Sequence, residues 1–146
     1  MTHKETLDKI HRMDLHSPAS SDLPLVTGSG VEWVVEAFGC APETLQDRRV
    51  LSRIFRAAVR DLGLTPVGRC RWHRFPGPGG LTGFWLLAES HLACHSFPEF
   101  GSVCFNLFCC RPRPAWAWRA ACRELLGAER ISVRRLERFY GDRDAG

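Results

Sequence analysis

Three reactive side chains stand at successive positions near the middle of the chain, directly after an apolar run. Glu89, Ser90 and His91 supply a carboxylate, a hydroxyl and an imidazole. A further histidine, His95, follows five residues after the serine, and Cys110 follows twenty residues after it. These groups are the usual components of nucleophilic and acid–base catalysis. The simpler interpretation is a polar turn between two strands.

Residue types alone leave the chemistry open. A Ser–His–carboxylate triad usually places its serine in a sharp turn flanked by glycine, and Glu-Ser-His contains no glycine. Glu89 with Glu99 would make a pair of carboxylates, and Cys110 with His95 would make a nucleophile and its base. Both pairs need a proximity that the sequence does not establish. Chemistry alone therefore favours none of them over the turn.

The spacing of the reactive residues resembles that of the prokaryotic S-adenosylmethionine decarboxylase family. Several chemically unusual residues match at once, which makes the resemblance specific, and it covers about residues 31–118. The matching segments are Glu36–Cys40, His73–Phe75, Glu89–Ser90–His91, His95, Pro98–Gly101 and Cys110.

The resemblance implies a proenzyme that cleaves itself between Glu89 and Ser90. The Ser90 hydroxyl would attack the Glu89 carbonyl and convert the peptide bond to an ester, with Thr82 steadying the tetrahedral intermediate. His95 would then remove the α-proton of Ser90, so that the chain breaks into fragments 1–89 and 90–146. The second fragment would begin with a pyruvoyl group, a covalent cofactor made from Ser90, and no metal is expected.

The implied reaction is decarboxylation of S-adenosylmethionine, which supplies the aminopropyl donor for spermidine. The pyruvoyl ketone would form a Schiff base with the substrate and accept its electrons as CO₂ leaves. Cys110 would return a proton to the α-carbon, whereas Cys109 would be a strand residue that faces the other side. Phe75 and Phe97 would attract the cationic adenosyl group, and Glu99 would bind the ribose hydroxyls.

The chain departs from the family pattern at positions that could border the substrate pocket. Asn106 stands where the family usually has Asp, Phe100 where it has Tyr, and Phe97 where it has Trp. A pyruvoyl-dependent decarboxylase of ornithine or arginine therefore stays open as an alternative. A non-enzymatic basic binding module is the remote alternative. Phe75 and Phe97 as core residues, and Glu99 as a turn carboxylate, stay open as well.

Composition favours a single soluble domain. The chain has 146 residues, and its net charge of +4 is too small to indicate nucleic acid as a partner. It contains no apolar run of the about 18–20 residues that a membrane helix needs, and no secretory signal, so we expect a cytoplasmic protein. Its seven cysteines include no CxxC pair, which favours reduced thiols over a zinc site.

The elements that must position the reactive residues alternate between strands and helices. Residues 1–29 predict a flexible leader with one helical turn around Thr6–Met13, and residues 30–146 predict a single decarboxylase domain. Helices are expected from Ala41 to Leu62 and from Pro114 to Leu126. Strands are expected at Val31–Phe38, Thr65–Phe75, Leu81–Glu89, His91–Phe97, Ser102–Cys110 and Arg130–Phe139.

This order, β-α-β-β-β-β-α-β, favours an antiparallel sheet with the helices on one face. The predicted fold class is therefore an α+β two-layer sandwich. The other face of the sheet needs a cover, and a second copy of the chain is a natural candidate. We expect a homodimer of the cleaved pair of fragments, with sheets or edges paired.

Overall fold

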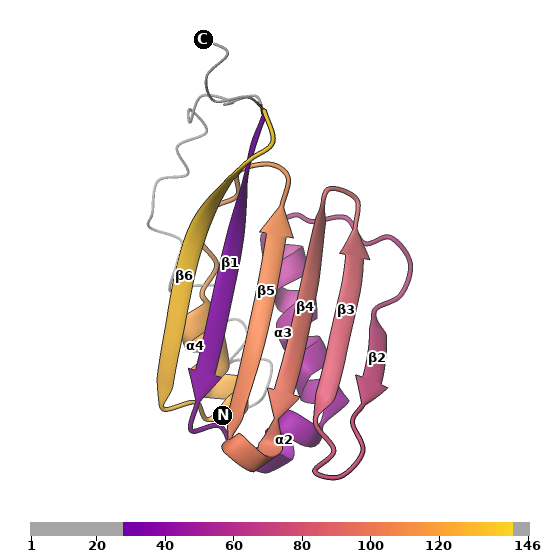
Figure 1. The fold of residues 1–146 in the computed structure, drawn as a ribbon, viewed down its shortest axis with the longest axis vertical. Helices are drawn as coiled ribbons and strands as arrows, with labels where there is room; N and C mark the ends of the chain where they lie inside the picture. Colours follow the sequence, from indigo (N-terminus) through magenta and orange to yellow (C-terminus); the bar gives the residue numbers. More distant parts are fainter. Residues whose placement is uncertain (1–27, 142–146) are drawn as a thin grey trace.

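A computed structural model describes residues 28–141, which form one six-stranded antiparallel sheet with helices against it (Figure 1). The strand order is β2-β3-β4-β5-β1-β6. The strands are β1 (Ser29–Phe38), β2 (Arg71–Arg74), β3 (Leu81–Leu87), β4 (Ser90–Phe97), β5 (Ser102–Cys109) and β6 (Arg130–Phe139). The predicted fold class, an α+β sandwich with an antiparallel sheet, is confirmed.

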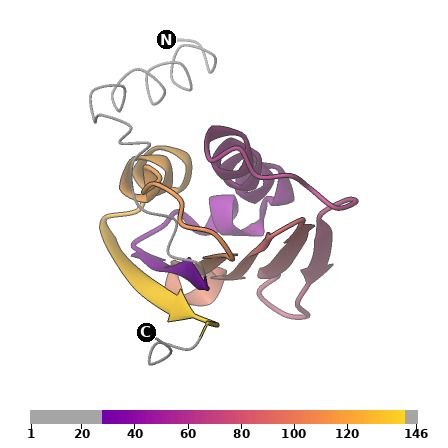
Figure 2. The same cartoon turned by 90° about the horizontal axis from the view of Figure 1, so that it is seen from above.

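The helices of the described residues lie on one face of the sheet (Figure 2). They are α2 (Pro42–Gln46), α3 (Arg48–Asp61) and α4 (Trp118–Leu126), and a 3₁₀ turn, η1 (Pro98–Phe100), joins β4 to β5. The single helix predicted from Ala41 to Leu62 is wrong. This segment forms two helices, α2 and α3, because the backbone of Asp47 between them is extended. Asp47 is the N-cap of α3, and its carboxylate accepts a hydrogen bond of 2.7 Å from the Arg49 N–H.

Other predicted boundaries also differ from the structure. The strand expected at Thr65–Phe75 is reduced to β2, because Pro66 lacks an N–H for the ladder and Gly68 has a positive φ of 71°. The helix expected from Pro114 begins only at Trp118. Ser29 belongs to β1, one residue inside the predicted leader, and the helical turn expected around Thr6–Met13 lies outside the described residues.

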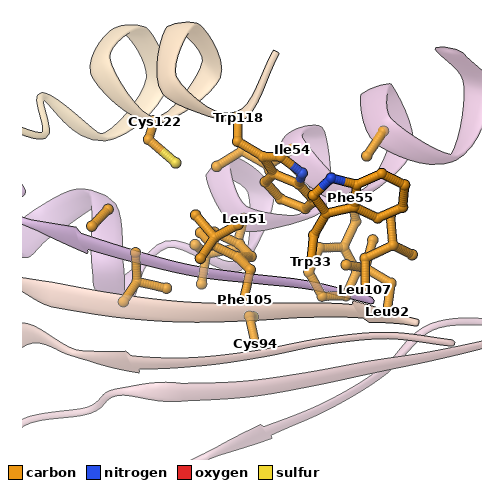
Figure 3. Close-up of a cluster of buried hydrophobic side chains, with 14 of the residues drawn as sticks. Trp33, Leu51, Ile54, Phe55, Leu92, Cys94, Phe105, Leu107, Trp118 and Cys122 are labelled. Atoms are coloured by element: carbon orange, nitrogen blue, oxygen red, sulfur yellow. The ribbon is translucent and has the colours of Figure 1, made fainter. Parts of the chain in front are cut away.

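The core lies between the sheet and the helices (Figure 3). Ile54 and Phe55 of α3 point at the sheet and meet the buried side chains of Trp33 and Phe105. Trp118 of α4 packs on Phe105 with ring centroids 5.6 Å apart. Burial alternates along β1 and β5, so each strand gives every second side chain to this core and the others to the opposite face.

The opposite face, called the open face below, has no helix over it in the part of the chain that is described (Figure 2). Phe84, Leu86 and Leu136 expose much of their apolar surface. The register places them on this face, because Leu86 pairs across the sheet with His91 and Leu136 pairs with Glu32. Among residues 28–141, no helix has the length and apolar composition to cross a membrane.

Candidate active site

The Glu89–Ser90 peptide bond lies at the tight turn that joins β3 to β4. Leu87 ends β3, Ala88 and Glu89 form the exposed turn, and Ser90 begins β4. Leu87 and Ser90 face each other as the first pair of this ladder. The strand expected to reach Glu89 therefore ends at Leu87, and the polar turn that was the simpler interpretation is present. The bond proposed for cleavage stands at the boundary of this turn with β4.

The Glu89 carbonyl accepts a hydrogen bond from the backbone N–H of Cys110, with an N···O distance of 2.8 Å. Its carbon is the atom that the Ser90 hydroxyl would attack. The N–H therefore points at the oxygen on which negative charge would develop, as a donor of an oxyanion hole does. A backbone donor could be expected beside Thr82, but not which one, because every residue except proline carries a backbone N–H and the sequence gives no sign of where it points.

Cys110 is held in place by a hydrogen bond to its backbone carbonyl and by close packing against Gly30. Its C=O accepts a hydrogen bond of 2.7 Å from the Tyr140 hydroxyl. Gly30 of β1 lies against the end of β5: a Cβ atom there would overlap the Cys109 carbonyl oxygen and stand 3.2 Å from the Cys110 Cα. Glycine at position 30 therefore allows β1 to approach the residue that contacts the cleavage junction.

The Ser90 side chain lies on the helix side of the sheet, where its register partner on β5 is Cys109. Cys109 is buried. Burial raises the pKa of its thiol, while a hydrogen bond with Ser90 and the nearby Arg113 guanidinium oppose part of that rise. In the intact chain, the thiol that contacts Ser90 is therefore that of Cys109. The role of Cys110 as the proton donor stays a prediction.

Thr82 and His95 form a second cluster at the far end of the β3–β4 hairpin. They are register partners, and Thr82 Oγ1 lies 3.0 Å from His95 Nδ1. The alternation of side chains puts both residues on the open face. Two of the residues predicted to act in processing are thus brought into direct contact.

The two clusters are far apart within one chain. Ser90 and His95 lie five positions apart on the regular strand β4. At about 3.3 Å per residue, their Cα atoms are about 16 Å apart. An odd spacing also places their side chains on opposite faces of the sheet. One chain therefore does not bring His95 to the Ser90 that it is predicted to act on.

The predicted substrate residues lie near the Thr82–His95 cluster. Phe75 follows β2 and Phe97 ends β4, and their half-buried rings have centroids 6.4 Å apart. Glu99 is exposed in η1. The structure thus brings the two aromatic residues together, and a ligand role for any of the three remains a prediction.

The model of the S-adenosylmethionine decarboxylase family matches residues 31–139. The chain belongs to this family. It is 30% identical over 112 residues to the S-adenosylmethionine decarboxylase proenzyme of Pyrobaculum islandicum, which covers 73% of this chain and 81% of that protein. The proenzyme of Pseudomonas aeruginosa is 30% identical over 123 residues, covering 83% of this chain and 75% of that protein.

A solved structure of the adenosylmethionine decarboxylase from Aquifex aeolicus has the same fold. The TM-score is 0.66 at 24% sequence identity, and the match covers 82% of this chain and 98% of that one. These comparisons confirm the family resemblance found in the sequence. The names of the two proenzymes support S-adenosylmethionine over ornithine or arginine as the substrate of the family.

Asn106, one of the departures from the family pattern, lies on the open face of β5. Its side-chain amide donates a hydrogen bond of 2.6 Å to Glu32 Oε1, and Arg138 donates to Glu32 Oε2. Burial by itself raises the pKa of the Glu32 carboxyl, but these hydrogen bonds and the charges of Arg138 and His91 outweigh it, so the pKa is lowered. Asn106 thus helps to keep a largely buried carboxylate ionised.

The side chain of Glu89 also has a charged partner. Arg111 Nη2 lies 2.9 Å from Glu89 Oε1, in an exposed ion pair that joins the turn to the segment after β5. Arg111 was not among the residues predicted from the sequence, although its place next to Cys110 was a usable signal. Within residues 28–141, no three or more His, Cys, Asp or Glu side chains are grouped to hold a metal ion.

Proposed function

We propose that the chain is a self-processing S-adenosylmethionine decarboxylase of the cytoplasm. The observation that carries the proposal is the junction itself. The chain belongs to this family, and its Ser90 directly follows an exposed turn. The carbonyl of Glu89, the residue before Ser90, accepts a hydrogen bond of 2.8 Å from the Cys110 N–H. The proenzyme names of the relatives support self-processing.

Cleavage would begin when Ser90 Oγ attacks the carbonyl carbon of Glu89. The C–N bond breaks, the hydroxyl proton passes to the Ser90 nitrogen, and an ester joins the two residues. The Cys110 N–H would stabilise the oxyanion of the intermediate. His95 would then take the α-proton of Ser90, which expels the Glu89 carboxylate and separates the two fragments. Addition of water and loss of ammonia would leave a ketone at residue 90.

The surroundings of Ser90 fit a pyruvoyl group at this position. Ser90 is the first residue of β4, and its register partner on β5 is Cys109, so pairing with β5 can hold the new chain end in place. A pyruvoyl ketone supplies the electron sink for decarboxylation. Cys110 stands next to this end and would give a proton to the α-carbon of the substrate.

We further propose that a complete site combines two protomers of a homodimer. The Ser90 backbone and Cys110 of one protomer would meet Thr82 and His95 of the partner, because His95 would act on the α-proton of Ser90 and not on its side chain. Two observations support this proposal: the two clusters are about 16 Å apart in one chain, and the open face that carries Thr82 and His95 exposes large apolar side chains such as Leu86. Apolar surface of this kind on a sheet face is typical of an interface.

S-adenosylmethionine is the substrate that the aromatic pair suits best. A sulfonium cation beside an aromatic face gains about 0.5–2 kcal/mol, and an adenine ring can stack on the same kind of side chain. Phe75 and Phe97 provide two such rings beside the Thr82–His95 cluster.

Release of labelled CO₂ from S-adenosylmethionine, ornithine and arginine, measured in parallel on the purified enzyme, tests this assignment. We expect release from S-adenosylmethionine alone. Release from ornithine or arginine, with none from S-adenosylmethionine, would replace the proposed substrate but leave the self-processing intact.

A further inference from the structure

Tyr140 is the only tyrosine of the chain, and it directly follows β6. Its backbone N–H donates to the Gly28 carbonyl at 2.9 Å, which fixes the residue after β6 beside the start of β1. Its hydroxyl donates to the Cys110 carbonyl at 2.7 Å and lies 3.3 Å from the Ser29 carbonyl oxygen. One side chain thus joins the last strand to the residue that follows β5.

Cys110 is contacted on both of its peptide groups. The N–H on its amino side donates to the Glu89 carbonyl, and the C=O on its carboxyl side accepts from Tyr140. The residue lies just past the last paired residue of β5, so no ladder pair of that strand fixes its orientation. The Tyr140 hydroxyl therefore holds a residue whose own N–H points at the bond to be cleaved.

We propose that Tyr140 is a positioning residue for self-cleavage, which keeps the Cys110 N–H aimed at the Glu89 carbonyl. The proposal rests on the proposed function, because it assigns a role in the cleavage of the Glu89–Ser90 bond. Tyr140 acts through Cys110 and touches neither reacting atom. It contributes to ester formation, where the oxyanion develops, and not to the later removal of the α-proton.

The size of the effect follows from the strength of such a donor. Removing one donor of an oxyanion hole slows a reaction by about 10²- to 10³-fold. Tyr140→Phe leaves the Cys110 N–H present and removes only what holds it, so ester formation should slow by roughly tenfold. Glu137→Gln is a matched control, since it changes an exposed β6 side chain that pairs with Arg135.

The experiment is a pulse-labelled cell-free synthesis of the full chain, followed over time for the appearance of the two fragments. The wild-type chain and Glu137→Gln should cleave at the same rate, and Tyr140→Phe about tenfold more slowly. Addition of hydroxylamine, which cleaves esters, separates the steps. With hydroxylamine, the Tyr140→Phe chain should still form fragments slowly, because little ester forms. A His95→Ala chain should accumulate the ester and be cut by the hydroxylamine.

A second measurement separates positioning from general stability. In uncleavable Ser90→Ala chains labelled with ¹⁵N-cysteine, Tyr140→Phe should speed hydrogen exchange at the Cys110 amide and leave the buried Cys94 amide of β4 unchanged. Faster exchange at both amides would mean that the hydroxyl acts on stability, and would overturn the proposal. Cleavage of Tyr140→Phe at the wild-type rate would overturn it as well. A wild-type chain that never cleaves would instead refute the proposed function.

Discussion

At the cleavage junction, the backbone and the side chain of one residue, Cys110, have different proposed roles. Cys110 offers its N–H to the Glu89 carbonyl, and any residue except proline at this position would keep that donor. Its thiol has a separate proposed task, which is to return a proton to the substrate. A substitution that removes the thiol should therefore affect decarboxylation and leave cleavage intact.

We expect Cys110→Ala to cleave close to the wild-type rate and to decarboxylate S-adenosylmethionine at least about 100-fold more slowly. Cys109→Ala is the matched control, because it removes the neighbouring buried thiol that contacts Ser90. It should lower the free energy of unfolding and keep turnover. Fragment formation by intact mass and CO₂ release measure the two roles. Turnover lost in Cys109→Ala and kept in Cys110→Ala would transfer the proton donor to Cys109.

Glu32 predicts a pH dependence of stability. Its folded pKa is lowered, net of burial, by the hydrogen bonds from Asn106 and Arg138. A lowered pKa gives stability that is present above the unfolded value of about 4.3 and is lost as pH falls through the folded value. Glu32→Gln should therefore cost more stability at pH 7 than at pH 3, as measured by urea unfolding. An equal cost at both pH values would contradict this assignment.

Elements were predictable where a local pattern was sufficient. Apolar runs separated by turn residues gave the β3–β4–β5 meander, and the apolar spacing of three and four gave the helical face of α3. The break at Asp47 was missed because the apolar spacing continues through it, while the side chain ends one helix and caps the next. The short β2 was missed because composition does not show where an edge strand stops pairing.

The site was predictable only in part, because a local pattern shows residue types and spacing but not contacts across the sheet. Ser90, His95 and Cys110 have side chains whose types and spacing can be recognised. The Cys110 N–H and the Tyr140 hydroxyl act through contacts across the sheet, between residues far apart in sequence. The separation of Ser90 from His95 also needed the structure, because it depends on β4 being regular across the whole interval.

The buried hydroxyl of Ser96 connects helix α2 to strands β3 and β4. Its Oγ accepts from the Leu81 N–H at 2.8 Å and donates to the Leu45 carbonyl at 2.7 Å, so it fastens α2 to the β3–β4 pair. Ser96→Ala leaves both groups unpaired in the core and should cost about 1–3 kcal/mol of unfolding free energy. Ser132→Ala on β6 serves as the control. Equal denaturation midpoints for both variants would contradict this role.

On the scale of the whole molecule, cleavage does not divide the fold. The first fragment would hold β1, β2 and β3, and the second β4, β5 and β6, yet β1 lies between β5 and β6 and β3 pairs with β4. The two fragments therefore share one sheet and one core. They should remain together in native conditions after cleavage.

The proposed dimer predicts complementation between two defective chains. Ser90→Ala lacks the nucleophile and His95→Ala lacks the base, so neither should form fragments when expressed alone. In a mixed dimer, the Ser90 of one chain would meet the His95 of the other. Co-expression with distinct tags should therefore cleave the His95→Ala chain only. If neither chain is cleaved, the two clusters do not combine across protomers.

The central claim is that the chain breaks its own Glu89–Ser90 bond, and the intact mass of the purified protein tests it most directly. We predict two species, 1–89 and 90–146, with no free amino group at the start of the second. The Ser90→Ala chain should remain whole. A wild-type protein that stays a single chain of 16.5 kDa would contradict the account.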